Sequence, residues 1–206
     1  MVSTVTDSVT TRRSGLREAT RRAVRAEISN AAMALFMEHG FEETTVEQVA
    51  AAVGMSGRSV FRYFATKEDI VVGAIEQVGH DLAAALRSRP SGEPAWEALR
   101  RAFDEPLRAL ENDGGIALAR STLLATTPSL RAAQQQKHAQ WNDLLAPALT
   151  GRLTGPETSR EYRAHAMVAA ALACLDTAVD QWTKSEGRQS LEELLDTAIA
   201  AVTGGG

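Results

Sequence analysis

The chain has 206 residues, of which 44% are apolar and 23% are charged, a composition that is ordinary for a globular protein with a sizeable core. No apolar run reaches the roughly 18 residues that a membrane span needs, so no membrane partner is expected. Cys174 is the only cysteine, which excludes an intrachain disulfide and a cysteine-based zinc cluster. The N-terminal residues 1–11 lack the apolar core of a signal peptide, and we therefore expect a cytoplasmic protein.

The net charge of −4 conceals a strongly basic N-terminal end. Residues 12–25 contain six arginines and one glutamate, whereas residues 71–206 contain 13 basic and 17 acidic groups. A basic end on an acidic chain is typical of a protein that binds a polyanion at that end. A solvated helix face would give the same charge count, so charge alone leaves both interpretations open.

Helical periodicity runs along almost the whole chain. Apolar residues recur at spacings of three and four, and alternating segments of the kind that form strands are nearly absent. The sequence therefore predicts an all-α fold. About nine helices are expected, over residues 21–39, 46–53, 57–63, 67–89, 94–111 with a bend at Pro106, 116–126, 128–149 with a second bend at Pro147, 157–184 and 190–202.

The first three expected helices have clear ends. The 21–39 helix has one apolar face and stops at Gly40, a residue that favours a helix C-terminus. Thr45 begins the second helix, and a glutamine three positions later completes a capping box. Gly54 ends that helix and Ser56 caps the third. Two short helices joined by a glycine-containing turn form a helix-turn-helix.

The helix-turn-helix is expected to divide its side chains between a core and an outer face. The residues that can pack the two helices together are Val46, Val49, Ala50, Val53, Val60 and Phe64. Arg58, Ser59 and Arg62 then point outward, where arginine can bond bidentately to guanine and serine can contact a base or a phosphate. Arg62 is equally well explained as a surface charge. Phe61 is expected to be core, as aromatic residues at helical spacing usually are.

The stretch from Thr44 to Asp69, TTVEQVAAAVGMSGRSVFRYFATKED, resembles the N-terminal domain of the TetR family of transcriptional repressors. The family pattern has a threonine pair, a short helix, a glycine, a small cap, an aromatic-rich recognition helix and a Lys-Glu-Asp start to the fourth helix. The resemblance extends over residues 20–70. It implies a DNA-binding domain over residues 20–66. The Ser/Thr-rich composition of the N-terminus predicts that a disordered basic arm precedes this domain, over residues 1–19.

The resemblance also implies two groups of DNA contacts. The phosphate contacts would be made by Thr45, Tyr63 and Lys67. Base readout would fall to Arg58 and Ser59, with Arg62 as a further candidate. The family often has a tyrosine bonded to a phosphate at the position of Phe61, which lacks the hydroxyl. Tyr63 could also simply pack with its hydroxyl exposed. The backbone arm would add phosphate contacts or enter the minor groove through Arg17, Arg21 and Arg22.

Residues 67–203 are expected to form a helical ligand-binding and dimerisation domain. The pattern through Thr127–Leu130, Trp141–Leu145 and Ala169–Trp182 resembles the C-terminal domain of the mycofactocin-type regulators, a TetR subgroup, which implies an acyl-CoA-like or otherwise lipophilic effector. Helix bends can open a gap between helices. The candidate pocket residues are Trp96, Phe103, Leu107, Leu118, Thr122, His138, Trp141 and Asn142. Taken singly, each of them is more often a core residue than a ligand contact, and His138 is more often a surface or satisfied histidine.

The last two helices carry a seam suited to packing against another helix. Apolar residues alternate spacings of four and three at Val168, Leu172, Leu175, Val179 and Trp182, and Leu191 and Leu195 continue the pattern. We expect these residues to pair two copies of the chain in a four-helix bundle. Cys174 lies in the seam, where a buried inert thiol is the expected state.

The leading hypothesis is a homodimeric TetR-type repressor, released from a pseudo-palindromic operator by an effector that favours the non-binding state. An enzyme is disfavoured, because the chain has no nucleophile elbow, P-loop, HExxH motif or dinucleotide fingerprint. Its four histidines have no metal-binding spacing, so no cofactor is expected. A helical lipid carrier or interaction module that merely retains the fold is the other alternative, and salt-dependent DNA binding would separate it from a regulator.

Overall fold

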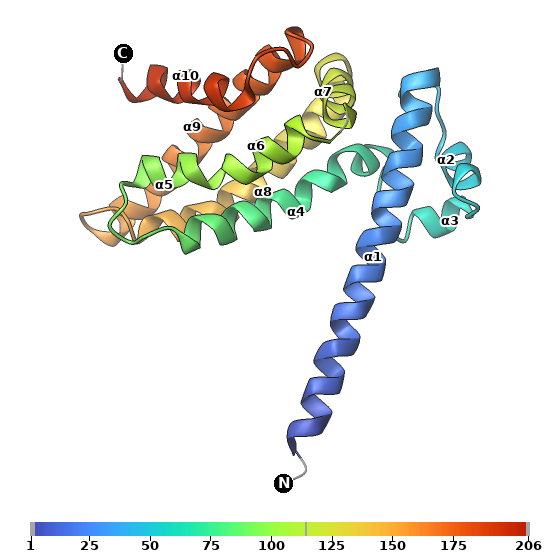
Figure 1. The fold of residues 1–206 in the computed structure, drawn as a ribbon, viewed down its shortest axis with the longest axis horizontal. Coiled ribbons are helices and arrows are strands. Elements are labelled where there is room, and N and C mark those ends of the chain that lie inside the picture. Colours follow the sequence, from blue (N-terminus) through green and yellow to red (C-terminus); the bar gives the residue numbers. More distant parts are fainter. Residues whose placement is uncertain (1–2, 114, 205–206) are drawn as a thin grey trace. The chain divides into compact units, whose positions relative to one another are not determined.

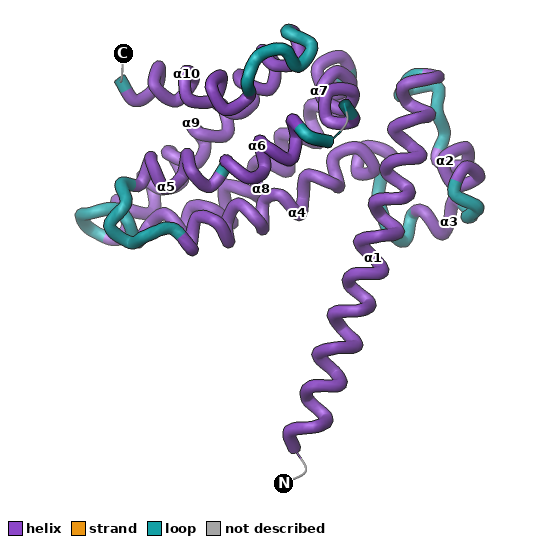
Figure 2. Tube along the Cα trace, viewed as in Figure 1, coloured by secondary structure: helices purple, strands orange, loops and turns teal. Residues whose placement is uncertain are grey.

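A computed structural model describes the backbone of residues 3–113 and 115–204, and the side chains within residues 17–73, 77–113 and 115–204. The described residues form ten helices and no strand, which confirms the predicted all-α class (Figures 1 and 2). None of these helices is long and apolar enough to cross a membrane. The helices are α1 (Ser3–His39), α2 (Val46–Ala52), α3 (Gly57–Val60), α4 (Lys67–Ser88), α5 (Ala95–Ala102), α6 (Asp104–Glu111), α7 (Ile116–Thr126), α8 (Pro128–Thr150), α9 (Glu157–Lys184) and α10 (Leu191–Thr203).

Helix α1 begins much earlier than the sequence predicted. The expected disordered arm over residues 1–19 is helical from Ser3 onward. This segment has no proline and its only glycine is Gly15, so no residue in it strongly terminates a helix. The side chains of residues 1–16, which include Arg12 and Arg13, lie outside the described residues.

The helix expected over residues 94–111 is divided in two at Phe103. Pro106 explains the division, because it has no N–H to give to the carbonyl of Ala102 and its ring crowds that carbonyl. The break therefore lies a turn before the proline, whereas the sequence predicted a bend at the proline itself. Pro147 lies inside α8, which is continuous across it.

The chain forms two compact units, residues 1–74 and 75–206, which divide inside α4 rather than at its start. The first turns of α4 belong to the N-terminal unit. Ile70 and Val71 are buried there, and the Ser29 hydroxyl of α1 donates to the carbonyl of Ile70 at 3.0 Å. The predicted boundary after residue 66 was drawn at a helix start, but α4 contributes core residues to the N-terminal unit.

A small apolar core joins the first three helices of residues 1–74. Phe36 of α1, Val49 of α2 and Val60 of α3 are each at most 1% exposed. The guanidinium carbon of Arg25 lies 4.5 Å from the centroid of the Phe64 ring, within the range of a cation–π interaction. These contacts orient the short helix α3, whose single turn could not hold a fixed direction by itself.

In residues 75–206, the longest helix is α9. It packs against α8 and α10 and also contacts α5 and α7. Cys174 is a buried free thiol on this helix, and burial raises its pKa. Helix α8 also packs against α4, where a Cβ at Gly79 would overlap the indole ring of Trp141. Only glycine permits that approach.

Arg100 of α5 ties its helix to α10. Its guanidinium donates to Asp104 at 2.5 Å, to Glu192 at 3.3 Å and to Asp196. Burial by itself would lower the pKa of Arg100, but the hydrogen-bonded carboxylates of Asp196 and Asp104 raise it. The side chain of Arg100 is only 11% exposed, whereas its two partners on α10, Glu192 and Asp196, are 46% and 57% exposed.

Candidate DNA-binding surface and ligand pocket

Helices α2 and α3 form the predicted helix-turn-helix, with both expected caps. The Thr45 hydroxyl accepts from the Gln48 N–H at 3.3 Å, and the Gln48 side chain accepts from the Thr45 N–H at 2.7 Å, which makes a capping box. Gly54 has φ 66°, a left-handed conformation that favours glycine. The Ser56 hydroxyl accepts from the Ser59 N–H at 3.2 Å and caps α3.

The recognition helix is shorter than the 57–63 range that the sequence predicted. Helix α3 ends at Val60, and the chain continues through tight turns. The N–H groups of Tyr63 and Phe64 both donate to the Val60 carbonyl, at 2.8 and 3.1 Å. The shared carbonyl winds the backbone more tightly than an α-helix does.

This segment separates buried from exposed side chains sharply. Val60 is 0% and Phe64 is 3% exposed, whereas Arg58 and Arg62 are exposed. The prediction that Phe61 is core was wrong, because its ring is 49% exposed. Residue 61 lies about 100° around the helix axis from residue 60, so the burial of Val60 turns its neighbour outward. We call Arg58, Ser59, Phe61 and Arg62 the recognition surface.

Several other predicted contact residues lie on the outside of residues 1–74. Thr45 is exposed at the start of α2, although its hydroxyl is engaged in the capping box. Ser59 and Tyr63 are half-buried, and the Ser59 hydroxyl lies 2.9 Å from that of Ser56. The predicted arm residues are also exposed, on α1: Arg17, Arg21 and Arg22.

Lys67 has a structural role that the sequence did not predict. Its ammonium donates to the carbonyls of Phe41, Glu42 and Thr44, at 2.7, 3.4 and 3.2 Å. It also lies 4.2 Å from the centroid of the Phe41 ring. An ammonium has three N–H donors, so this turn between α1 and α2 occupies all of them. The phosphate contact expected of Lys67 has no donor left to make it.

None of the predicted pocket residues lines the pocket that the described residues form between α7, α8 and α9. Phe103, Leu107 and Trp141 are core, at 1%, 1% and 4% exposed, and Trp96 and Leu118 pack partly against that core. These five side chains therefore contribute to helix packing.

The polar members of the predicted set are engaged elsewhere. The Thr122 hydroxyl donates to the Leu118 carbonyl of its own helix. Asn142 donates to the carbonyl of His165 at 3.1 Å, and its side-chain oxygen lies 2.6 Å from His165 Nδ1. His138 is buried, with Nδ1 3.3 Å from Oδ2 of Asp176.

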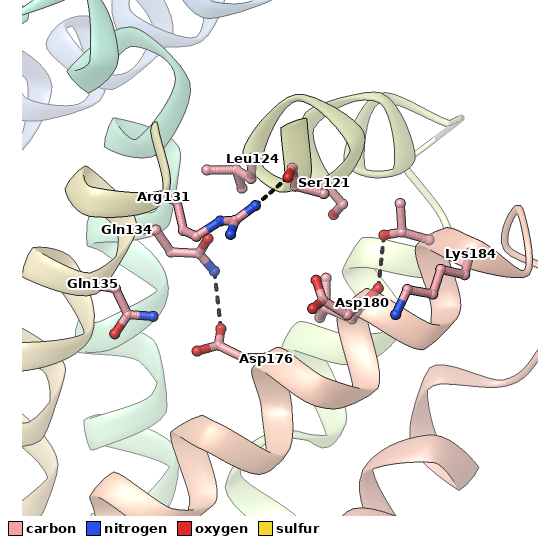
Figure 3. A pocket seen from close by; sticks show the side chains of 11 residues that line it. Ser121, Leu124, Arg131, Gln134, Gln135, Asp176, Asp180 and Lys184 are labelled. Carbon is pink, nitrogen blue, oxygen red and sulfur yellow. Dashed lines mark hydrogen bonds between the residues drawn. The ribbon is translucent and has the colours of Figure 1, made fainter. Parts of the chain in front are cut away.

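A pocket of about 350 Å³ lies between α7, α8 and α9 (Figure 3). It contains polar residues that the sequence reasoning missed. The signal was present as polar positions on one face of α9, at 176, 180 and 184, directly after the apolar run of residues 167–175. The lining residues are Ser121, Leu124, Ala125, Arg131, Gln134, Gln135, Asp176, Val179, Asp180, Thr183 and Lys184.

The predicted dimer seam is an internal seam of one chain. Six of its seven residues are at most 8% exposed within the single chain, and Val179 is partly buried. These side chains fill the space between α9, α8 and α10, so they are not available to a second copy. The residues concerned are Val168, Leu172, Leu175, Val179, Trp182, Leu191 and Leu195.

Comparison with known proteins assigns a family to both the helix-turn-helix region and the C-terminal helices. Residues 28–74 match the model of bacterial regulatory proteins of the tetR family, and residues 93–205 match the MftR C-terminal domain. HTH-type transcriptional regulator TcmR of Streptomyces glaucescens is 32% identical over 179 residues, which cover 82% of this chain and 79% of TcmR. The chain belongs to the TetR family. It is therefore a transcriptional regulator rather than an enzyme, as the sequence predicted.

Other TetR-family proteins are similar over most of their length. The putative mycofactocin biosynthesis transcriptional regulator MftR of Mycobacterium tuberculosis is 28% identical, over 86% of this chain and 88% of MftR. The crystal structure of Thermus thermophilus FadR, a TetR-family repressor in complex with lauroyl-CoA, has a TM-score of 0.59 at 22% identity. It covers 87% of this chain and 93% of that one. At this identity the likeness to FadR shows the TetR-family fold.

Removing the Lys67 ammonium should lower stability without removing a phosphate contact. Lys67→Met keeps the aliphatic stem over Phe41 but leaves three carbonyls without their donor, and we expect a loss of about 1–2 kcal/mol in the free energy of unfolding. The slope of log K against log salt for DNA binding should stay at the wild-type value, whereas Arg21→Ala should reduce it by about 1. A reduced slope with unchanged stability in Lys67→Met would show that Lys67 binds phosphate after all.

Proposed function

We propose that this TetR-family protein is a homodimeric repressor that binds a pseudo-palindromic operator and is released by a small molecule. The observation that carries the proposal is the recognition surface. Its two arginines and its exposed ring project from a turn whose inner residues, Val60 and Phe64, are buried. A turn anchored in this way can present the same side chains to a major groove each time it docks.

The recognition surface supplies base contacts of two kinds. Arg58 and Arg62 offer guanidinium forks to guanine, and Ser59 can contact a base or a phosphate. Phe61 offers an apolar surface to the methyl group of thymine. Thr45 and Tyr63, with Arg17, Arg21 and Arg22 of α1, are assigned to phosphates, which position the protein without reading sequence.

The first experiment is an anisotropy titration against the DNA that flanks the protein's own gene, at two salt concentrations, beside an unrelated duplex. We expect selective, salt-dependent binding to the flanking DNA. Arg58→Ala should weaken binding there by about 1–3 kcal/mol and leave the unrelated duplex almost unaffected. Arg101→Ala, which removes an exposed arginine from α5 in the other unit, is the matched control. Equal weak binding to both duplexes would favour the carrier or interaction module.

The same titration tests the class of effector. The resemblance to mycofactocin-type regulators suggests a lipophilic or acyl-CoA-like molecule, and the fold likeness to FadR is compatible with it. We place an acyl chain in the apolar core beside the partly buried Trp96 and Leu118, because in the pocket between α7, α8 and α9 it would cover charged side chains without replacing their hydrogen bonds. We therefore expect lauroyl-CoA, but not free CoA, to release the operator. Release by both, or by neither, would reject the lipophilic class.

Thymine readout by Phe61 can be isolated by removing the methyl group from the DNA. Replacing each operator thymine in turn by deoxyuridine should weaken wild-type binding at one position in each half-site, and Phe61→Ala should abolish that sensitivity. Arg58→Ala should leave the sensitivity in place, because it removes a different contact. If the wild-type protein responds to no deoxyuridine, or if Phe61→Ala keeps the full response, Phe61 does not read thymine.

The dimer surface must use faces of α9 and α10 that the single chain leaves exposed. Small residues lie along such a face of α9, spaced by three or four positions: Ala166, Ala169, Ala173 and Thr177. Tyr162, which is 76% exposed, begins the same face, and Val202 of α10 is 57% exposed. Small residues let two helices approach closely, so we assign the two-fold contact to this stripe.

A charge placed in the stripe should separate the two chains. Ala173→Asp would carry an unpaired carboxylate into the contact, and we expect sedimentation to show a monomer at concentrations where the wild type is a dimer. Ala109→Asp, at an exposed alanine of α6, is the control with the same helix-propensity cost. A dimer in both variants, or a monomeric wild type, would overturn this assignment.

A further inference from the structure

The pocket between α7, α8 and α9 carries opposite charges on opposite walls. Arg131 comes from α8, whereas Asp176 and Asp180 come from α9 and face it across the cavity (Figure 3). Lys184 lines the same pocket one turn beyond Asp180. The lining therefore contains two groups of each sign, with Arg131 on α8 and with Asp176, Asp180 and Lys184 on α9.

Two of these charges are held in place by contacts that leave much of their bonding capacity free. Asp176 accepts from the Gln134 amide at 3.1 Å, and His138 Nδ1 lies 3.3 Å from its other oxygen. The Arg131 guanidinium donates to the carbonyl of Ala125, in the last turn of α7. A guanidinium has five donors and a carboxylate accepts about four bonds, so both groups have unused bonding positions.

The charges of the lining do not neutralise one another. Within the described residues, no ion pair joins Arg131 or Lys184 to Asp176 or Asp180. Asp180 and Lys184 are four positions apart on one helix, a spacing at which such pairs commonly form, and yet they remain separate. Leu124 and Val179 add apolar surface to the lining. The cavity thus offers a guanidinium from α8, two carboxylates and an ammonium from α9, and apolar surface.

We infer that this pocket binds a small amphoteric molecule that carries both a protonated amine and a carboxylate, such as an amino acid or a dipeptide. The carboxylate pairs with Arg131, whose planar fork suits it, and the amine pairs with Asp176 and Asp180. A volume of about 350 Å³ lies in the range of small-molecule sites. A fatty acyl chain is a poor occupant, because it would cover four charged groups without replacing their hydrogen bonds.

This binding site does not depend on the proposed function, but its role as an effector site does rest on it. A zwitterion that bridges α8 and α9 and touches α7 would hold three helices of the unit in one arrangement. Only a difference in affinity between the DNA-binding and the non-binding state would turn that into regulation.

The test is calorimetry on the full chain with leucine and with alanyl-leucine, which differ in the separation of amine and carboxylate. Each is compared with its N-acetyl derivative, which lacks the ammonium, and with its C-terminal amide, which lacks the carboxylate. We expect at least one parent compound to bind, and both of its derivatives to bind about tenfold more weakly. If neither parent binds, or if a derivative binds as well as its parent, the inference is overturned.

Variants of the charged lining residues test which group of the ligand each residue binds. Asp180→Asn should remove the preference over the N-acetyl derivative and keep the preference over the amide. Arg131→Gln should remove the preference over the amide and keep the preference over the N-acetyl derivative. Lys184→Gln removes the other basic group of the lining. Asp143→Asn removes a carboxylate of α8 outside the lining and should change neither preference. Preferences that survive both Asp180→Asn and Arg131→Gln would place the ligand elsewhere and overturn the inference.

Failure of the site and failure of the proposed function can be told apart. Operator binding that depends on Arg58, without calorimetric binding of either parent compound, would reject the pocket and keep the repressor. Calorimetric binding of a parent with unchanged operator affinity would keep the site and reject its regulatory role.

Discussion

The burial of Val60 and Phe64 determines what the DNA-binding unit can present to DNA. Helix α3 is too short to define its own direction, so its orientation comes from these two anchors. Phe64 lies beneath the guanidinium of Arg25 and against Gly73, where a Cβ would be 3.0 Å from the Phe64 ring. The close approach of α4 thus fixes the ring, the ring fixes the turn, and the turn leaves Arg58, Phe61 and Arg62 outside. Loss of any of these contacts would widen the range of orientations of all three side chains together.

In residues 75–206, packing around α9 likewise determines which side chains remain exposed. Because α8 and α10 both pack on this helix, most of its apolar residues are used within the chain. What remains is the polar face toward the pocket and the stripe of small residues. The two surfaces proposed for ligand binding and for dimerisation are therefore the parts of α9 that the core leaves free. Occupation of the pocket and pairing of two chains would act on one rigid element, which gives a physical route between ligand and dimer geometry.

The features that sequence predicted well depend on local chemistry. The capping box at Thr45, the glycine at 54 and the serine cap at 56 each act within one turn of backbone, so residue types and spacing were enough to place the helix-turn-helix. The predictions that failed concern residues whose packing partners come from another helix or another chain. Helical periodicity shows that Val168 and Leu172 face a partner, but an internal helix and a second chain give the same pattern. The pocket was not predicted from the sequence for the same reason, because its lining residues come from three helices. Phe61 was misassigned because an aromatic residue was assumed to be core, although its neighbour Val60 already occupied the inner position.

The contacts proposed for the recognition surface would shift the balance between affinity and specificity for DNA. In the TetR family the position of Phe61 is often a tyrosine that binds a phosphate, and Lys67 was expected to bind another. Here the first group has no hydroxyl and the second gives its donors to the turn between α1 and α2. Phosphate contacts hold all DNA sequences alike, whereas a contact to a thymine methyl group holds only some. On the proposed assignment of Phe61 to thymine, losing two phosphate contacts and gaining one apolar base contact would lower non-specific binding more than specific binding. The exposed arginines of α1 would then supply salt-dependent attraction, and the recognition surface would discriminate between sequences.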